Sequence, residues 1–354
     1  MKRIFITGGS GFIGSTFIRE LLKNESVSVL NFDLLTYAGN NESLRDVDQL
    51  PNYKFVHGDI ADEKFLSDVV DDFCPDVLFN LAAESHVDRS IDDAKPFLHS
   101  NVVGTFTVLS VMLRYWQKLS GDAAKQFRML HISTDEVYGS LGKDGIFTEE
   151  TRYAPRSPYS ATKAASDHLV RAWFFTYGLP VLITNCSNNY GPYQNPEKLI
   201  PKTIISAISN LPLTIYGDGR HIRDWLFVED HVRALLCVMS KGRVGETYNI
   251  GGENQHSVIE TVLMICDLLD QKKPRENGSK YSELIRFVPD RLGNDLRYAV
   301  DVTKLRTEFG WQQNYNFAAG LEKTVTWYLN NEWWWKSINL WHAPNVVIPE
   351  YGIE

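Results

Sequence analysis

Short apolar runs alternate with longer amphipathic segments along the first half of the chain. Apolar runs of this length predict buried strands, and the amphipathic segments between them predict helices. We expect helices that end near Lys23 and that span Phe97–Leu119 and Tyr159–Tyr177, and strands at Lys2–Thr7, Val27–Phe32, Tyr53–Val56, Asp76–Leu81, Gln126–Ser133 and Val181–Asn185. Such alternation predicts a doubly wound parallel α/β sheet, with ligands at the carboxyl ends of its strands.

The pattern changes after Asn185, where proline and glycine interrupt short apolar segments. These residues favour turns over long regular elements. We therefore expect residues 1–185 to form the sheet domain, with a return of residues 225–250 to it. Residues 186–354 are predicted to form mainly a smaller, mixed α/β C-terminal lobe that binds the substrate.

Composition and charge narrow the classes of function. The chain has 354 residues, is 44% hydrophobic and carries a formal charge of −8 without a block of Lys or Arg, which argues against a nucleic-acid partner. No apolar run reaches the length of a membrane helix, and the first strand begins at residue 2, so we expect no signal peptide, no membrane partner and a cytoplasmic protein. The cysteines are widely spaced and the histidines show no ligand spacing, which predicts reduced thiols and no metal site.

A glycine-rich turn follows the first predicted strand. Gly8, Gly11 and Gly14 keep the Gly-x-x-Gly-x-x-Gly spacing between a strand and a helix, which is typical of a dinucleotide-binding Rossmann fold. A plain glycine turn is the alternative. Asp33, at the end of the second strand, is placed to hold a ribose diol and would repel a 2′-phosphate, so we predict NAD rather than NADP. Asp59 is predicted near the adenine; a role as N-cap of the following segment is the alternative, and the two roles are compatible.

Tyr159 and Lys163 lie four residues apart on a predicted helix and so share one of its faces. We expect the Lys163 ammonium to lower the pKa of the Tyr159 phenol from about 10 and to bond the nicotinamide ribose. The tyrosinate would then take a proton from a sugar hydroxyl that Thr134 also contacts. Without the glycine turn upstream, a tyrosine and a lysine that merely line a helix would explain the pattern.

Asp135 and Glu136 are adjacent carboxylates at the end of the fifth predicted strand. Both reach one substrate only if the backbone leaves the strand pleat there. Close carboxylates push their pKa values apart, so one keeps a proton near neutral pH and serves as acid while the other serves as base. The sequence does not decide which, and two solvated acids in a turn are the alternative. An acid and a base beside Tyr159 predict that a ketone intermediate loses water.

Longer motifs carry a resemblance over nearly the whole chain. Together with the glycine turn, they resemble the extended short-chain dehydrogenases and, within them, the dTDP-glucose 4,6-dehydratases. The motifs are Thr134-Asp135-Glu136, Tyr159-Ser160-Ala161-Thr162-Lys163, the segments 81–90, 185–194 and 196–201, Ile222-Arg223-Asp224-Trp225-Leu226 and Asp290-Arg291.

The resemblance implies a bound NAD that takes hydride from C4, loss of water across C5 and C6, and return of the hydride to C6. It also implies Asp135 as the acid, Glu136 as the base at C5, Tyr159 as the base at the C4 hydroxyl, and a homodimer paired through the two long helices. The implied cofactor-binding residues are Gly8, Gly11, Phe12, Ile13, Gly14, Asp33, Asp59, Ile60, Ala82, Ala83, Tyr159, Lys163 and Asn189. The implied substrate-binding residues are Ser85, Thr134, Asn188, Lys198, Leu199, Tyr216, Arg223 and Arg291.

The forked guanidinium of Arg223 suits a diphosphate, although surface ion pairs are the alternative for Arg223 and Arg291. Two positions depart from the family pattern, because Val258 stands where we align a usual Asn, and Asn294 stands where His is common. Both are expected on the nucleotide side of the site.

Other functions on the same scaffold make different demands. A UDP-hexose 4,6-dehydratase shares the chemistry and differs in the base that it accepts. A nucleotide-sugar 4-epimerase has no use for the acid–base pair, and a decarboxylase needs a site for a substrate carboxylate that Asp135 would oppose. A non-catalytic dinucleotide-binding protein would have lost Tyr159, Lys163 or the acids, and all are present.

Overall fold

The computed structural model describes residues 1–290 and 292–338. Its largest element is a seven-stranded sheet in the order β10-β6-β5-β4-β1-β2-β3, and every pair of neighbouring strands is parallel. The strands are β1 (Lys2–Thr7), β2 (Val27–Asp33), β3 (Tyr53–His57), β4 (Val77–Asn80), β5 (Arg128–Thr134), β6 (Val181–Cys186) and β10 (Thr247–Ile250). The prediction of a doubly wound parallel sheet is therefore confirmed.

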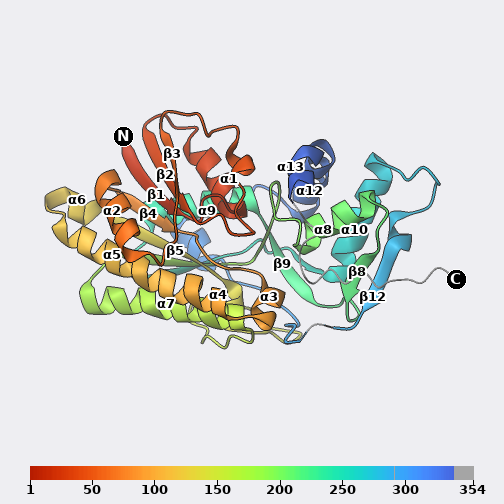
Figure 1. Cartoon of the computed structure of the whole chain (residues 1–354). Helices are drawn as coiled ribbons and strands as arrows, with labels where there is room; N and C mark the ends of the chain where they lie inside the picture. The colour runs from red at the N-terminus through yellow and green to blue at the C-terminus, as the bar shows by residue number, and fades with distance from the viewer. Residues whose placement is uncertain (291, 339–354) are drawn as a thin grey trace.

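Helices cover both faces of this sheet, as the near-continuous apolar strands require. Along β1, Ile4 and Ile6 face one hydrophobic core while Phe5 faces the other, because successive side chains of a strand point to opposite faces. One face packs against α1 (Phe12–Leu21), α9 (Val228–Lys241) and α11 (Thr303–Phe309), and the other against α2 (Glu63–Phe73), α5 (Thr105–Lys118) and α7 (Pro158–Tyr177). Figure 1 shows α5 and α7 side by side along the second face.

The predicted helix at Phe97–Leu119 is one continuous helical stretch with an irregular first half. It runs through α4 (Lys95–Phe97), a π-helical segment at Leu98–Gly104, and α5. By length and composition alone, Lys95–Lys118 could cross a membrane, but half of its most apolar part is buried in the structure. A core helix meets the same criterion, and this helix packs on α2 and α7.

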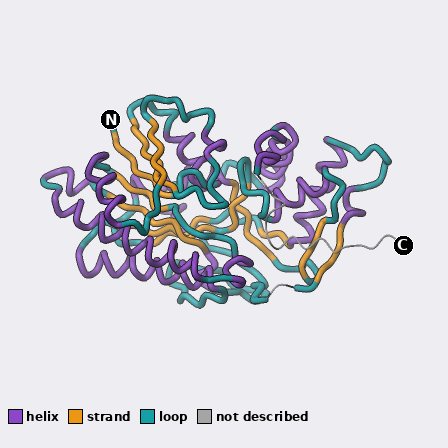
Figure 2. Tube along the Cα trace, in the orientation of Figure 1, coloured by secondary structure: helices purple, strands orange, loops and turns teal. Residues whose placement is uncertain are grey.

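The rest of the chain builds a second lobe beside the sheet (Figure 2). Its core gathers residues such as Tyr190, Ile204, Ile265 and Leu321. The lobe contains a three-stranded sheet of β7 (Asn188–Tyr190), β9 (Ile222–Phe227) and β11 (Gln255–Ser257), and a two-stranded sheet of β8 (Leu213–Tyr216) and β12 (Ile285–Val288). Its helices are α8 (Leu199–Ile208), α10 (Val258–Lys272), α12 (Phe317–Asn330) and α13 (Glu332–Ser337), and the short helices elsewhere are α3 (Val87–Asp92) and α6 (Gly121–Gln126). The division at residue 185 stays a prediction.

Candidate active site

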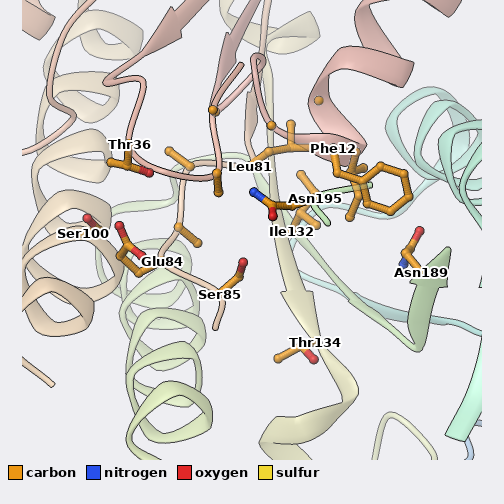
Figure 3. Close-up of a pocket in the computed structure, with 18 of the residues that line it drawn as sticks. Phe12, Thr36, Leu81, Glu84, Ser85, Ser100, Ile132, Thr134, Asn189 and Asn195 are labelled. Atoms are coloured by element: carbon orange, nitrogen blue, oxygen red, sulfur yellow. The ribbon is translucent and has the colours of Figure 1, made fainter. Parts of the chain in front are cut away.

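A large cavity lies at the carboxyl ends of the sheet strands, where the sheet domain meets segment 186–198. Figure 3 shows side chains from the glycine turn, from the strand ends and from segment 189–195 around it. Every predicted cofactor residue and all five predicted catalytic residues line this cavity, as do Ser85, Asn188 and Lys198. The structure therefore brings together groups that are up to about half the chain apart in sequence.

The glycine turn leaves no room for side chains on the cavity wall. Gly8 has φ +72°, and a Cβ atom there would lie 2.6 Å from the backbone nitrogen of Ala82, while a Cβ on Gly14 would lie 2.4 Å from the Gly8 carbonyl oxygen. Gly11 is the N-cap of α1 and offers no side chain to the first backbone N–H groups of that helix. This helix end therefore suits an anionic diphosphate.

Asp33 ends β2 and lines the same cavity. Its carboxylate accepts hydrogen bonds from the backbone N–H groups of Ser10 (2.9 Å) and Leu35 (2.8 Å), and burial raises the pKa of Asp33. A carboxylate fixed at this strand end suits a ribose diol. The glycine turn, the uncapped helix and Asp33 together fit NAD.

Asp59 also lines the cavity, and one of its oxygens lies 2.8 Å from Nε2 of His99. The alternative role as N-cap of the next helix is wrong, because Asp62 caps α2 by accepting a hydrogen bond from the Phe65 N–H.

The backbone leaves the strand pleat at the acid pair, as both carboxylates require. β5 ends at Thr134, and Asp135–Tyr138 form a 3₁₀ turn that Thr134 caps by accepting a hydrogen bond from the Glu136 N–H (3.3 Å). The turn places both acids on the cavity wall. The Thr134 hydroxyl also lies 3.3 Å from Oδ1 of Asp135, while Oδ2 of Asp135 is buried without a hydrogen-bond partner among the described residues.

Burial and the neighbouring Glu136 raise the pKa of Asp135 well above its usual value. Loss of hydration disfavours the charged carboxylate, and a second negative charge adds to the effect. Asp135 is only 1% exposed. The structure therefore favours Asp135 as the acid that keeps its proton near neutral pH.

Asp135→Asn should remove a pH-dependent loss of stability. A carboxyl whose pKa is raised by folding stabilises the protein fully below its unfolded pKa of about 3.9, and this contribution is lost as pH rises through the folded pKa. Because Asn cannot ionise, the variant should melt near the wild-type temperature at low pH and increasingly above it as pH rises. Thermal unfolding measured across pH tests this, with Asp144→Asn as an exposed control. A difference in melting temperature between variant and wild type that does not widen as pH rises would contradict the burial argument.

Tyr159 and Lys163 lie at the start of α7, which begins with Pro158 after the capping residue Ser157. The Lys163 ammonium donates a hydrogen bond to the Ile132 carbonyl oxygen (2.8 Å) on β5. In the protein alone the pKa of Tyr159 is raised well above 10, first by burial and then by Glu136, while a hydrogen bond with Thr134 opposes the shift. The expectation that Lys163 lowers the pKa of Tyr159 is therefore not met by the protein alone, in which only the Thr134 hydrogen bond opposes the effect of burial.

The predicted substrate residues do not all reach the cavity. The Lys198 ammonium donates to the Ser85 carbonyl oxygen (3.0 Å), which ties two of its walls together. Leu199, Tyr216 and Arg223 are not among the residues that line it, and Tyr216 is 43% exposed at the end of β8. Arg291 lies outside the described residues.

Arg223 instead hydrogen-bonds residues of the second lobe. Its guanidinium donates to the Asp295 carbonyl oxygen and to the Asn294 side chain (both 3.0 Å) and lies over the Tyr298 ring. It still lies near enough to Asp135 to lower the pKa of that acid against the effect of burial. The contact of Arg223 with a substrate diphosphate stays a prediction.

Sequence reasoning missed part of the cavity wall. The loop after Asp33 contributes Leu34, Thr36, Ala38 and Gly39, and two acids, Glu84 and Glu197, also line the cavity. Both acids stand inside motifs that the sequence displays, Ala82-Ala83-Glu84-Ser85 and Pro196-Glu197-Lys198. Glu84 is held by Asn101, which exchanges hydrogen bonds with its backbone from the π-helical segment. Such π segments are frequent at functional sites.

Fold and site together define a dinucleotide-dependent enzyme of the short-chain dehydrogenase type, with an acid pair added to the tyrosine and lysine. The family model described as GDP-mannose 4,6 dehydratase matches residues 5–324. The dTDP-glucose 4,6-dehydratase of Neisseria meningitidis serogroup B is 54% identical over 341 residues, 96% of each chain. The chain belongs to the dTDP-glucose 4,6-dehydratase family.

Solved structures of named dTDP-glucose 4,6-dehydratases are similar to this chain in fold and sequence. The structure of dTDP-glucose 4,6-dehydratase from Bacillus anthracis in complex with NAD has a TM-score of 0.85 and 44% identity, and covers 96% of this chain and 100% of that one. DesIV, the dTDP-glucose 4,6-dehydratase of Streptomyces venezuelae with NAD and TYD bound, has a TM-score of 0.87 and 43% identity over 95% of this chain and 99% of that one.

Proposed function

We infer that this chain is an NAD-dependent hydro-lyase that converts dTDP-glucose to dTDP-4-keto-6-deoxyglucose. One observation carries the inference. The 3₁₀ turn brings Asp135 and Glu136 to the same cavity wall as Tyr159 and Lys163. Groups for oxidation and groups for elimination therefore face one substrate. High identity to the named dehydratases over nearly the full chain supports the same reaction.

NAD supplies the hydride acceptor at C4 and, once reduced, the hydride donor at C6. Gly8, Gly11 and Gly14 would admit its diphosphate at the start of α1, and Asp33 would hold its adenosine ribose. Lys163 would hold the nicotinamide ribose from α7.

The first step removes the C4 hydroxyl proton. Tyr159 accepts this proton while Thr134 hydrogen-bonds the same hydroxyl. Burial opposes tyrosinate in the protein alone, so proton removal would need positive charge nearby, which Lys163 and a bound oxidised nicotinamide would supply. Proton removal is thereby linked to an occupied cofactor site.

The second step removes water across C5 and C6. The ketone at C4 acidifies the proton on C5, and Glu136 takes that proton. Asp135, which burial keeps protonated, gives its proton to the departing C6 hydroxyl so that water leaves. Glu136 then returns a proton to C5 as hydride arrives at C6, so the substrate loses one water and no cofactor is consumed.

The test is incubation of the purified protein and NAD with a panel of nucleotide hexoses. We expect a 4-keto-6-deoxy product from dTDP-glucose without a stoichiometric build-up of reduced cofactor. A product epimerised at C4 with its 6-hydroxyl intact would favour the epimerase. Turnover of UDP-glucose alone would move the activity to the UDP-hexose dehydratases, and cofactor binding without any product would favour a non-catalytic protein.

We also propose that two copies of the chain associate through the long helix and α7. Large apolar side chains stand exposed on this pair of helices, and Phe106 of α5 touches the Trp173 ring of α7 edge-on. The exposed apolar side chains are Leu98, Val103, Phe106, Phe175 and Tyr177. Exposed apolar area on packed helices is typical of a subunit interface. The cytoplasmic location stays a prediction.

Phe106→Glu should convert the dimer into a monomer, because it places a charge in the apolar contact. Light scattering after size-exclusion chromatography measures the mass directly. Phe287→Glu is the matched control, since Phe287 is also exposed but lies on β12 in the second lobe. A monomeric wild type, or a Phe106→Glu variant that stays dimeric, would contradict this interface.

A further inference from the structure

A chain of buried polar side chains runs through the sheet beneath the catalytic residues. The Thr7 hydroxyl donates to Oδ1 of Asn80 (2.6 Å), and the amide nitrogen of Asn80 lies 3.0 Å from Nδ1 of His131. On its other side, Nε2 of His131 lies 3.4 Å from Oδ1 of Asp167. These residues are at most 1% exposed, and the proposed reaction uses none of them. Their polarity in a sheet core therefore needs another explanation.

The direction of the hydrogen bonds fixes the state of His131. Because the Thr7 hydroxyl donates to Asn80 Oδ1, the Asn80 amide donates to Nδ1 of His131 and the ring proton lies on Nε2. This nitrogen lies 3.2 Å from the Ser166 hydroxyl oxygen and 3.4 Å from Oδ1 of Asp167. Burial and then the Lys163 ammonium lower the pKa of His131, so the ring stays neutral. The neutral ring thus lies against the Asp167 carboxylate (3.4 Å) without cancelling its charge.

Asp167 is tied to the strand end that carries the catalytic residues. Its Oδ2 atom accepts hydrogen bonds from the Ser133 hydroxyl (2.8 Å) and the Tyr153 hydroxyl (2.9 Å). Ser133 directly precedes Thr134 on β5. Asn185 donates both to the Tyr153 hydroxyl (3.2 Å) and to the Thr134 carbonyl oxygen (3.1 Å). The carboxylate therefore fixes Thr134 from two sides.

Asp167 is also the only carboxylate on α7, the helix that carries Lys163. The two residues are four apart and share a helix face. Lys163 is 4% exposed and Asp167 fully buried, so the ammonium has given up most of its hydration and needs a compensating charge. Burial lowers the pKa of Lys163 and Asp167 opposes the shift. Burial would raise the pKa of Asp167, yet His131, Lys163 and Ser133 bring it below its usual value.

The other titratable groups around this pair do not replace Asp167. Cys186 on β6 has its pKa raised to about 12 by burial, and burial also raises the pKa values of Tyr138 and Tyr153. These groups are neutral near pH 7. The remaining neighbours are Arg171, whose guanidinium reaches the Tyr153 hydroxyl (2.9 Å), His168 beside the Tyr153 ring, and Asp135, Glu136 and Tyr159 on the cavity wall.

We propose that Asp167 is a positioning residue for C4 oxidation, which keeps Lys163 charged and fixes the end of β5 that presents Thr134. The proposal rests on the proposed role of Lys163 beside Tyr159. It assigns to the chain Thr7–Asn80–His131 the task of holding the carboxylate in its charged form.

Asp167→Asn should lower the pKa of Lys163 by about 1–3 units, because it removes an opposite charge and keeps the shape of the side chain. Carbon-13 NMR of protein labelled at lysine Cε reports this pKa without substrate, and Lys163→Arg assigns the signal. In the holoenzyme, the alkaline limb of the pH profile for C4 oxidation should move to lower pH. Asp230→Asn is the control, because Asp230 is fully buried on α9, where it binds Arg233 and the Tyr315 backbone. It should leave the pKa of Lys163 and the pH profile of C4 oxidation unchanged.

A double variant tests the same charge pair through stability alone. If Asp167 and Lys163 compensate each other, Lys163→Met combined with Asp167→Asn should be destabilised less than the sum of the two single variants. The double variant tests the charge pair even if Asp167→Asn alone fails to fold, because removal of both charges should then recover folding. An unchanged pKa of Lys163, additive losses of stability, or a double variant that also fails to fold would overturn the proposal. These readouts need no turnover, so they are independent of the substrate assignment.

Discussion

Glu136→Gln and Asp135→Asn should each slow the dehydration of dTDP-glucose by about 10²–10⁴-fold, the usual contribution of general acid–base catalysis. Both variants keep Tyr159 and Lys163, so oxidation at C4 should survive better than water loss. Glu136→Gln removes the base at C5, while Asp135→Asn removes the proton that the departing hydroxyl needs. The absorbance of reduced nicotinamide should therefore persist after mixing, instead of decaying as the hydride returns to C6.

Tyr159→Phe is the matched contrast, because it removes only the group that accepts the C4 hydroxyl proton. It should suppress the reduced-nicotinamide absorbance itself. Rapid mixing of each variant with substrate separates the two behaviours, since absorbance reports oxidation and product analysis reports water loss. Identical traces from all three variants would refute the division of roles between the turn at 135–138 and the start of α7.

The preference for dTDP-glucose over UDP-glucose should be about 10–200-fold in kcat/KM rather than absolute. The two bases differ by one methyl group, and an apolar pocket distinguishes a methylene or methyl by about 1–3 kcal/mol. Val258 begins α10 and has no side-chain group to hydrogen-bond a base. Asn294 already accepts from Arg223 and donates to Asp290 (2.8 Å).

Val258→Asn should raise this preference, because it restores the amide that the family pattern carries at that position. Leu263→Asn, on an exposed position of the same helix, is the control and should leave the ratio unchanged. The ratio of kcat/KM for the two substrates is the measurement. A strict requirement for UDP-glucose would overturn the substrate assignment and leave the dehydratase chemistry in place.

Sequence reasoning succeeded where function depends on local spacing. The glycine turn, Asp33 and the pair Tyr159 and Lys163 are each set by a strand end or a helix turn, so their order along the chain predicts their meeting at the sheet edge. The departure from the pleat at Asp135 could be predicted as a requirement, and the structure supplies it as a 3₁₀ turn.

Features that depend on tertiary packing could not be predicted in the same way. The raised pKa of Tyr159 follows from how deeply α7 buries the phenol. Tyr216 ends β8, which pairs with β12 in the second lobe, and is not among the residues that line the cavity. Of the tryptophans at 333–335, Trp334 and Trp335 are buried and Trp333 is exposed. The network around Asp167 joins β1, β4, β5 and β6 to α7, and no spacing in the sequence predicts such contacts.

The most direct test of the account follows hydrogen through one turnover. dTDP-glucose that carries deuterium at C4 should yield a product with that deuterium at C6, because the hydride removed in oxidation is the one returned. Unlabelled substrate in heavy water should gain deuterium at C5, through the proton that Glu136 returns, and none at C6. Deuterium that stays at C4, or solvent deuterium at C6, would contradict the claim that one site performs oxidation, elimination and reduction in sequence.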